Sequence, residues 1–252
     1  MSYSDRDLRE RDPENAKKAA GTVLAIGKAG REARLNADYS NASIISTRAY
    51  NAILTGTVLW GILLSAILCT LVGNVYEVIN PLLFIILYLA LAIGGCVLAN
   101  KSHKPALSFL GFNMVAVPFG LLISTVVSQY LEVDPSIVYY AILDTGLITL
   151  GMFGLAMAFP GFVSKLSGML LVCLGGMIFC ELILLVFGVD QGITDWIGAG
   201  LFSLYIAYDI YRSQQFEKTT DNAIDCALDI YMDIANLFLR ILSIIAKAKS
   251  KD

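Results

Sequence analysis

The sequence predicts an all-α polytopic membrane protein, a seven-helix transmembrane bundle with six clear spans and a semipolar seventh. Of its 252 residues, 57% are hydrophobic and only 15% are charged, whereas a soluble domain carries about a quarter charged residues. Of the 18 basic and 21 acidic residues, 16 lie before position 50. The long apolar runs show no period-two alternation, which favours helices. These observations exclude a cytosolic enzyme, a nucleic-acid-binding protein and a disordered chain.

The chain divides into a polar N-terminal tail and an apolar remainder. Residues 1–47 carry mixed charges and an Ala-rich stretch that favours a solvated helix. We expect this tail to be cytoplasmic and residues 48–252 to form the transmembrane domain.

The first three spans follow from apolar runs long enough to cross a bilayer core, which takes about 20 helical residues. We expect them at 51–73, 82–99 and 106–130. Pro118 lies inside the third span, where it frees a backbone carbonyl and predicts a kink. Turn residues separate these spans, at Gly73-Asn74, Asn80-Pro81 and Lys104-Pro105.

The next four helices follow the same logic. We expect spans at 136–159, 166–188 and 192–212, with turn residues at Asp134-Pro135 and Pro160-Gly161. A seventh, less apolar helix is expected at about 221–246.

Basic residues occur at every second connection, which predicts the orientation. After the basic tail they occur at Lys101, Lys104, Lys165, Arg212 and Lys218. The positive-inside rule therefore places the N-terminus in the cytoplasm. The short loops and compact size favour a bacterial inner membrane.

The seventh helix leaves its own path open. Lys247, Lys249 and Lys251 follow it. The charge rule favours a helix that dips in and returns, whereas its length permits a full crossing.

Metal and disulfide sites have little support. The five cysteines form no Cys-x-x-Cys pair, and His103 is the single histidine. Neither a zinc site nor a disulfide framework fits this pattern, and we expect no cofactor.

Acidic residues inside the predicted spans are the strongest functional signal, because each costs on the order of 2.5–3.5 kcal/mol on insertion scales. Asp144 lies in the fourth span, Glu181 in the fifth and Asp209 in the sixth. The seventh helix carries an acidic stripe at i, i+4 and i+8, which Asn236 and Arg240 roughly continue. This stripe consists of Asp225, Asp229 and Asp233.

Asp209 and Asp233 are the pair that we expect to interact, since the sixth and seventh helices are antiparallel neighbours. Two carboxyl groups within hydrogen-bonding range share a proton and titrate as a unit. Such a pair can sense pH or, when ionised, transiently hold Ca²⁺. The two residues lie at different depths. They meet only if the sixth helix continues past the membrane face or the seventh enters late.

The other acids differ in how readily an ordinary solvent-exposed position explains them. Asp225 and Asp229 can form a solvated face, and we expect Glu181 to be wet at the outer interface. Asp144 lies deep in its span and is expected to act in the pathway or in a buried network.

The C-terminal third resembles the Bax inhibitor family, also called transmembrane Bax inhibitor motif proteins. The resemblance rests on GAGLFSLYIAYDIYRSQQ and DNAIDCALDIYMDIANLFLRIL. The rest, over about 45–246, agrees in layout. The resemblance implies a seven-helix bundle with a central seventh helix, and a pH-sensitive calcium leak channel in the bilayer.

The family's functional residues then fall on particular positions here. Its di-aspartyl pH sensor falls on Asp209 and Asp233, and its fourth-span acid on Asp144. By position, Lys101 takes the part of a basic latch, although relatives with the latch use arginine. Lysine lacks the bidentate fork of arginine, so the latch would be weaker or absent. The second-span acid of some relatives has no counterpart.

Other functions remain as alternatives. An intramembrane aspartyl protease also carries Tyr-Asp, as in Tyr208-Asp209, but it needs Gly-x-Gly-Asp, which is missing before Asp233. We therefore expect no enzyme. A non-transporting regulatory protein that acts through helix contacts stays open, and small residues would suit it. A secondary transporter is weakened because no inverted repeat is evident.

Overall fold

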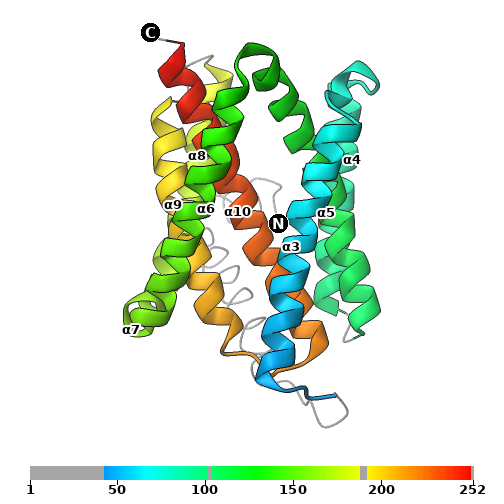
Figure 1. Cartoon of the computed structure of the whole chain (residues 1–252), viewed down its shortest axis with the longest axis vertical. Coiled ribbons are helices and arrows are strands. Elements are labelled where there is room, and N and C mark those ends of the chain that lie inside the picture. Colours follow the sequence, from blue (N-terminus) through cyan, green and yellow to red (C-terminus); the bar gives the residue numbers. More distant parts are fainter. Residues whose placement is uncertain (1–42, 102–103, 188–191, 251–252) are drawn as a thin grey trace, which may run out of the picture. The chain divides into compact units, whose positions relative to one another are not determined.

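Long α-helices build the chain in the computed structural model, which describes residues 43–101, 104–187 and 192–250 (Figure 1). Seven helices of 20 residues or more occur in these ranges, which confirms the predicted all-α class. They are α3 (Thr47–Leu71), α4 (Pro81–Lys101), α5 (Pro105–Val133), α6 (Pro135–Ala158), α8 (Ser167–Val186), α9 (Gly192–Ser213) and α10 (Thr220–Lys249). The short helices are η1 (Val75–Glu77), α7 (Pro160–Val163) and η2 (Ser164–Leu166).

Polar residues at the ends of the apolar runs start and stop these helices. The side chains of Ser46, Asp134 and Thr219 each accept a backbone N–H two or three residues further on, at 2.8 to 3.2 Å, as N-caps do. Gly73 turns the chain after α3 with a φ of 65°, which glycine adopts without strain. The third span runs on through Pro118 without a break in α5.

Four of the described helical stretches are long and apolar enough to cross a membrane. They are Thr47–Leu71, Pro105–Val133, Pro135–Ala158 and Pro160–Glu181, and a shorter apolar stretch covers Pro81–Gly95. Leucine, isoleucine and phenylalanine side chains are exposed along these helices, as expected where lipid replaces water. The chain is therefore an integral multi-pass membrane protein.

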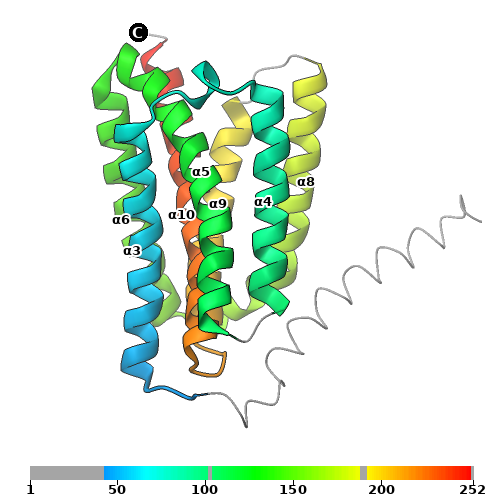
Figure 2. The same cartoon turned by 90° about the vertical axis from the view of Figure 1, so that its right-hand side faces the viewer.

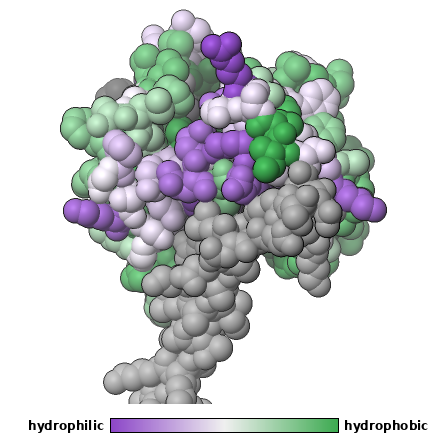
Figure 3. Space-filling view, turned by 90° about the horizontal axis from the view of Figure 1, so that it is seen from below, coloured by the Kyte–Doolittle hydropathy of each residue, from purple (hydrophilic) through white to green (hydrophobic). Residues whose placement is uncertain are grey.

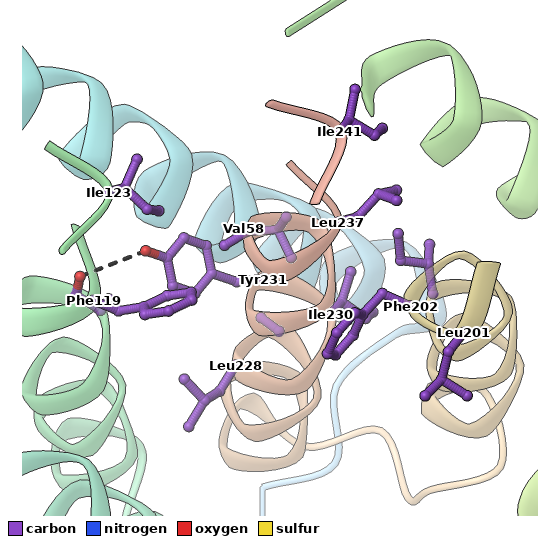
Figure 4. Packing of buried hydrophobic residues seen from close by; sticks show 14 of the residues in the cluster. Val58, Phe119, Ile123, Leu201, Phe202, Leu228, Ile230, Tyr231, Leu237 and Ile241 are labelled. Carbon is purple, nitrogen blue, oxygen red and sulfur yellow. Dashed lines mark hydrogen bonds between the residues drawn. The ribbon is translucent and has the colours of Figure 1, made fainter. Parts of the chain in front are cut away.

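The most polar helix, α10, lies at the centre of the bundle. It packs against α9, α3, α5 and α6, and Figure 2 shows it between the outer helices. Its core contacts are close: Tyr231 is 1% exposed, and its ring packs against Phe112. The same ring packs against Phe119, as Figure 4 shows. The central position expected for the seventh helix is confirmed.

Connections alternate between two ends of the bundle, here called the N-terminal end, where α3 begins, and the C-terminal end, where α10 finishes (Figure 1). The helix α10 is unbroken over 30 residues. Near its end, Lys249 forms an ion pair with Asp134 on the α5–α6 connection. The seventh helix therefore crosses the whole bundle, and the return path favoured by the charge rule is wrong.

Candidate functional site

Asp209 of α9 and Asp233 of α10 meet inside the bundle. Their residues are 7% and 8% exposed, and their carboxyl groups are joined by a side-chain hydrogen bond. The second oxygen of Asp233, Oδ2, is buried and has no hydrogen-bond partner within the described residues. A carboxylate oxygen of this kind can take up a proton or a cation.

The pair meets because α10 begins well beyond the end of α9. The hydroxyl of Tyr50 donates to the carbonyl oxygen of Ser213 at 2.8 Å and also lies 3.6 Å from the sulfur of Cys226. The last residue of α9 is thus level with the second turn of α10. This offset brings Asp233 beside Asp209, so the seventh helix does enter late.

The connection that makes this offset is held by its own contacts. The Lys218 ammonium lies 4.6 Å from the centre of the Tyr50 ring, and burial lowers the pKa of Lys218. Ile45 donates its backbone N–H to the carbonyl oxygen of Lys218 at 2.8 Å. The segment before α3 is therefore fastened to the α9–α10 connection.

Arg212 binds the acids of both helices together. Its Nη2 lies 3.3 Å from Oδ1 of Asp209, one turn back on α9, and it also forms an ion pair and hydrogen bond with Asp229 of α10. Its guanidinium carbon lies 5.8 Å from the centre of the Tyr208 ring. Sequence reasoning treated Arg212 only as a marker of orientation. Its i+3 spacing from Asp209 was the available signal.

The remaining stripe residues of α10 have different surroundings. Asp225 is buried, whereas the side chain of Asp229 is 44% exposed. Asn236 is half-buried, and its side-chain amide donates to the carbonyl oxygen of Met232 in its own helix at 2.8 Å. Hydrophilic side chains gather near the centre of the N-terminal end, as Figure 3 shows from below.

Two predicted residues lie outside this group. Asp144 is exposed on α6 among exposed apolar residues, and the structure does not bring it to the aspartate pair. Lys101 is the last residue of α4, but its side chain lies outside the described residues, so its part as a latch stays a prediction.

Arg240 belongs to a second ion-pair cluster, nearer the C-terminal end. Its Nη1 lies 2.6 Å from Glu181 of α8 and 3.2 Å from Asp195 of α9. Asp195 also accepts hydrogen bonds from Ser243 at 2.6 Å and from Lys247 at 2.9 Å. The expectation of a wet Glu181 is wrong, because its side chain is 19% exposed and bound to Arg240. Asp195 was missed as a partner, because the sequence shows only an acid at a helix start.

The described part of the chain contains no group of three or more His, Cys, Asp or Glu residues that could hold a metal ion. Asp209 and Asp233 offer two carboxyl groups, and Arg212 and Asp229 lie beside them. The two carboxyl groups can exchange protons, and a cation can replace Arg212 as the partner of Asp209. It does not form a closed metal cage.

The sequence matches a family described as "Inhibitor of apoptosis-promoting Bax1" over residues 45–250. Two uncharacterized proteins, from two strains of Helicobacter pylori, are each 37% identical over 93 residues. These matches cover 36% of the chain and 39% of each relative, so the chain matches them over about two fifths of their length.

Proposed function

The chain belongs to the Bax inhibitor family, and from this premise we propose that it is a pH-sensitive calcium leak channel of the membrane, gated by Asp209 and Asp233. The observation that carries the proposal is the buried hydrogen bond between these two carboxyl groups. Two carboxylates offer only acceptors, so a hydrogen bond between them needs a proton. The pair is therefore a proton-dependent contact between α9 and α10.

In this proposal Arg212 acts as a latch, beside the part that Lys101 is predicted to take. It engages Asp209 and Asp229 at once and so ties α9 to α10 beside the pair. A change in protonation alters the repulsion between the two carboxyl groups and the hold of Arg212 on Asp209. The N-terminal end then opens, and Ca²⁺ passes Asp233. Calcium is the permeant ion, and no cofactor takes part.

The proposed setting is a bacterial inner membrane with the N-terminus in the cytoplasm. The bases at the N-terminal end support this orientation, and relatives in a bacterium support the setting. Proton sensing would then occur at the cytoplasmic end of the path.

The test is calcium flux into liposomes that hold the purified protein, measured between about pH 6 and pH 8, because two neighbouring carboxyl groups bind protons as a coupled pair. Wild-type flux should change several-fold over this range. Asp209→Asn and Asp233→Asn should each give a flux that no longer depends on pH. Asp134→Asn is the matched control, because the same change falls at the opposite end of the bundle. Arg212→Gln should raise the flux of the closed state, and Arg212→Lys should raise it less.

Two results would count against the channel. Flux no greater than in empty liposomes at every pH would remove the leak function. A pH response in both aspartate variants equal to that of the wild type would remove the pair as its sensor.

A non-transporting regulatory protein is the second candidate, and the exposed position of Asp144 favours it. A carboxyl group in the middle of a lipid-facing helix is costly unless a partner meets it. On the same helix, Gly146, Gly151 and Gly154 have open space where a side chain would stand, which suits close contact with another helix. This function would be favoured if no calcium flux occurs and if the protein binds another membrane protein in a way that Asp144→Leu abolishes.

A further inference from the structure

Arg240 lies on the face of α10 along which the proposed channel would conduct. It follows Asp233 by seven residues, which is two helical turns, so the two side chains share a face about 10 Å apart. Asn236 lies between them, one turn from each. A cation that leaves Asp233 toward the C-terminal end along this face would therefore pass the guanidinium group.

The side chain of Arg240 packs closely against Gly198 of α9, a contact here called its seat. A Cβ atom at Gly198 of α9 would stand 3.0 Å from Nε and 3.1 Å from Cδ of Arg240. The arginine side chain thus lies directly against the α9 backbone, closer than side chains usually approach a Cβ atom. Gly200, two residues further on, has nothing within 4 Å of the same position.

Acids on two other helices hold the guanidinium in this seat. Glu181 comes from α8 and Asp195 from α9, and both contact Nη1. Lys247 takes the other oxygen of Asp195 at 2.9 Å. The two carboxylates therefore already face bases of this chain, and an entering cation has to compete with Arg240 and Lys247 for them.

We propose that Arg240 is a second closure of the channel, a charged plug seated on Gly198 that shuts the path at the C-terminal end and opposes cation passage there. The plug works in series with the aspartate pair, two turns away. For conduction this inference rests on the proposed function. The closure itself is a property of the bundle and can be measured without conduction.

The first test measures access to a cysteine placed between the two closures. In a protein with its five native cysteines replaced, Asn236→Cys is labelled with a membrane-impermeant thiol reagent added on the side of the C-terminus. Ser250→Cys, at the exposed end of the chain, reports that the reagent reaches this side. Labelling at position 236 should be slow with Arg240 in place.

Two substitutions should open the closure by different routes. Arg240→Gln removes the plug, and Gly198→Ala displaces it by a few tenths of an ångström with every charge retained. Arg240→Gln should label position 236 several-fold faster and Gly198→Ala faster by a smaller factor, whereas Gly200→Ala should behave like the parent protein and Arg240→Lys should stay nearly as slow. Equal labelling rates in Arg240→Gln, Gly198→Ala and Gly200→Ala would overturn the inference.

Flux on the same variants separates the two proposals. At the pH that opens the aspartate pair, Arg240→Gln should raise calcium flux several-fold over Gly200→Ala, and Gly198→Ala should raise it by a smaller factor. Faster labelling without flux in any variant would retain the closure and reject the calcium channel. A wild-type flux that depends on pH but does not change in either variant would reject Arg240 as a barrier.

Discussion

At the scale of single residues, the charge of Asp134 joins the connection between α5 and α6 to the end of α10. Its carboxylate caps α6 and accepts from the Lys249 ammonium and from Ser136. Hydrogen bonds from Lys249, first, and from Ser136 lower the pKa of Asp134 to about 2 from 3.8. A lowered pKa in the folded state means that the ionised form stabilises the fold.

This gives a prediction with a definite pH window. The stabilisation should be complete above the ordinary pKa of aspartate, about 3.9, and lost as the pH falls to about 2. Asp134→Asn keeps a capping side chain but not the charge, so it should melt below the wild type at pH 5. The difference should close between pH 4 and pH 2 and shrink in high salt. Melting curves in detergent measure this, and a difference that stays constant with pH would contradict it.

Residue identities inside the site could be predicted only in part. Asp209 and Asp233 stood out because acids are costly in apolar spans and because of the family resemblance. The sequence could not show that Arg212 bridges two helices, since Asp229 lies 17 residues away and reaches it through the late entry of α10. Asp144 was expected to take part in the pathway or a buried network, and the fold places it on an exposed face instead.

At the scale of elements, the central helix α10 packs closely against α3 through Tyr231. A Cβ atom at Gly61 would lie 2.7 Å from Cδ2 of Tyr231 and 2.9 Å from Cζ of Phe112. Tyr231 in turn shares a hydrogen bond of 2.8 Å with Ser65, one turn along α3. The glycine therefore allows an aromatic ring of α10 to lie against the α3 backbone.

Gly61→Ala should lower the free energy of unfolding by about 1–3 kcal/mol, because the added methyl overpacks a fully buried contact. Gly56→Ala is the matched control on the same helix, since nothing lies within 4 Å of its Cβ position. That variant should be neutral or more stable by up to about 1 kcal/mol, given the higher helix propensity of alanine. Thermal unfolding of both proteins in the same detergent tests the pair, and equal losses would show that the contact is not tight.

The elements themselves were well predicted, because apolar length and turn residues act locally. The offset between α9 and α10 was not, because it depends on Tyr50, which reaches across from α3 to Ser213 and Cys226. Contacts between residues more than 160 positions apart leave no pattern in a single sequence. The aspartate pair was thus foreseeable as chemistry but not as geometry.

At the scale of the whole molecule, α10 carries the chain to the C-terminal end against the simple charge rule. Lys247 and Lys249, which the rule would keep on the cytoplasmic side, are paired with Asp195 and Asp134. Pairing lowers the cost of placing these bases at the end of the bundle opposite the start of α3. The charge count failed for this helix because it takes no account of partners.

The fold therefore predicts that the start of α3 and the end of α10 lie on opposite sides of the membrane. With the proposed cytoplasmic N-terminus, a protease-accessible tag there should be protected in intact cells, and the same tag at the C-terminus should be cut. Inverted membrane vesicles should give the reverse pattern. Two tags that are both protected in cells would mean that α10 does not cross.

The polarity of α10 has a consequence for how the protein is made. A helix that carries Asp225, Asp229 and Asp233 is too costly to leave the translocon for lipid alone. Arg212 of α9 pairs with Asp229, and α3, α5 and α6 pack against α10. We therefore expect the last two helices to insert together as a hairpin, beside the spans that precede them. In a chain that ends after α9, Asp209 and Arg212 would lack their partners on α10.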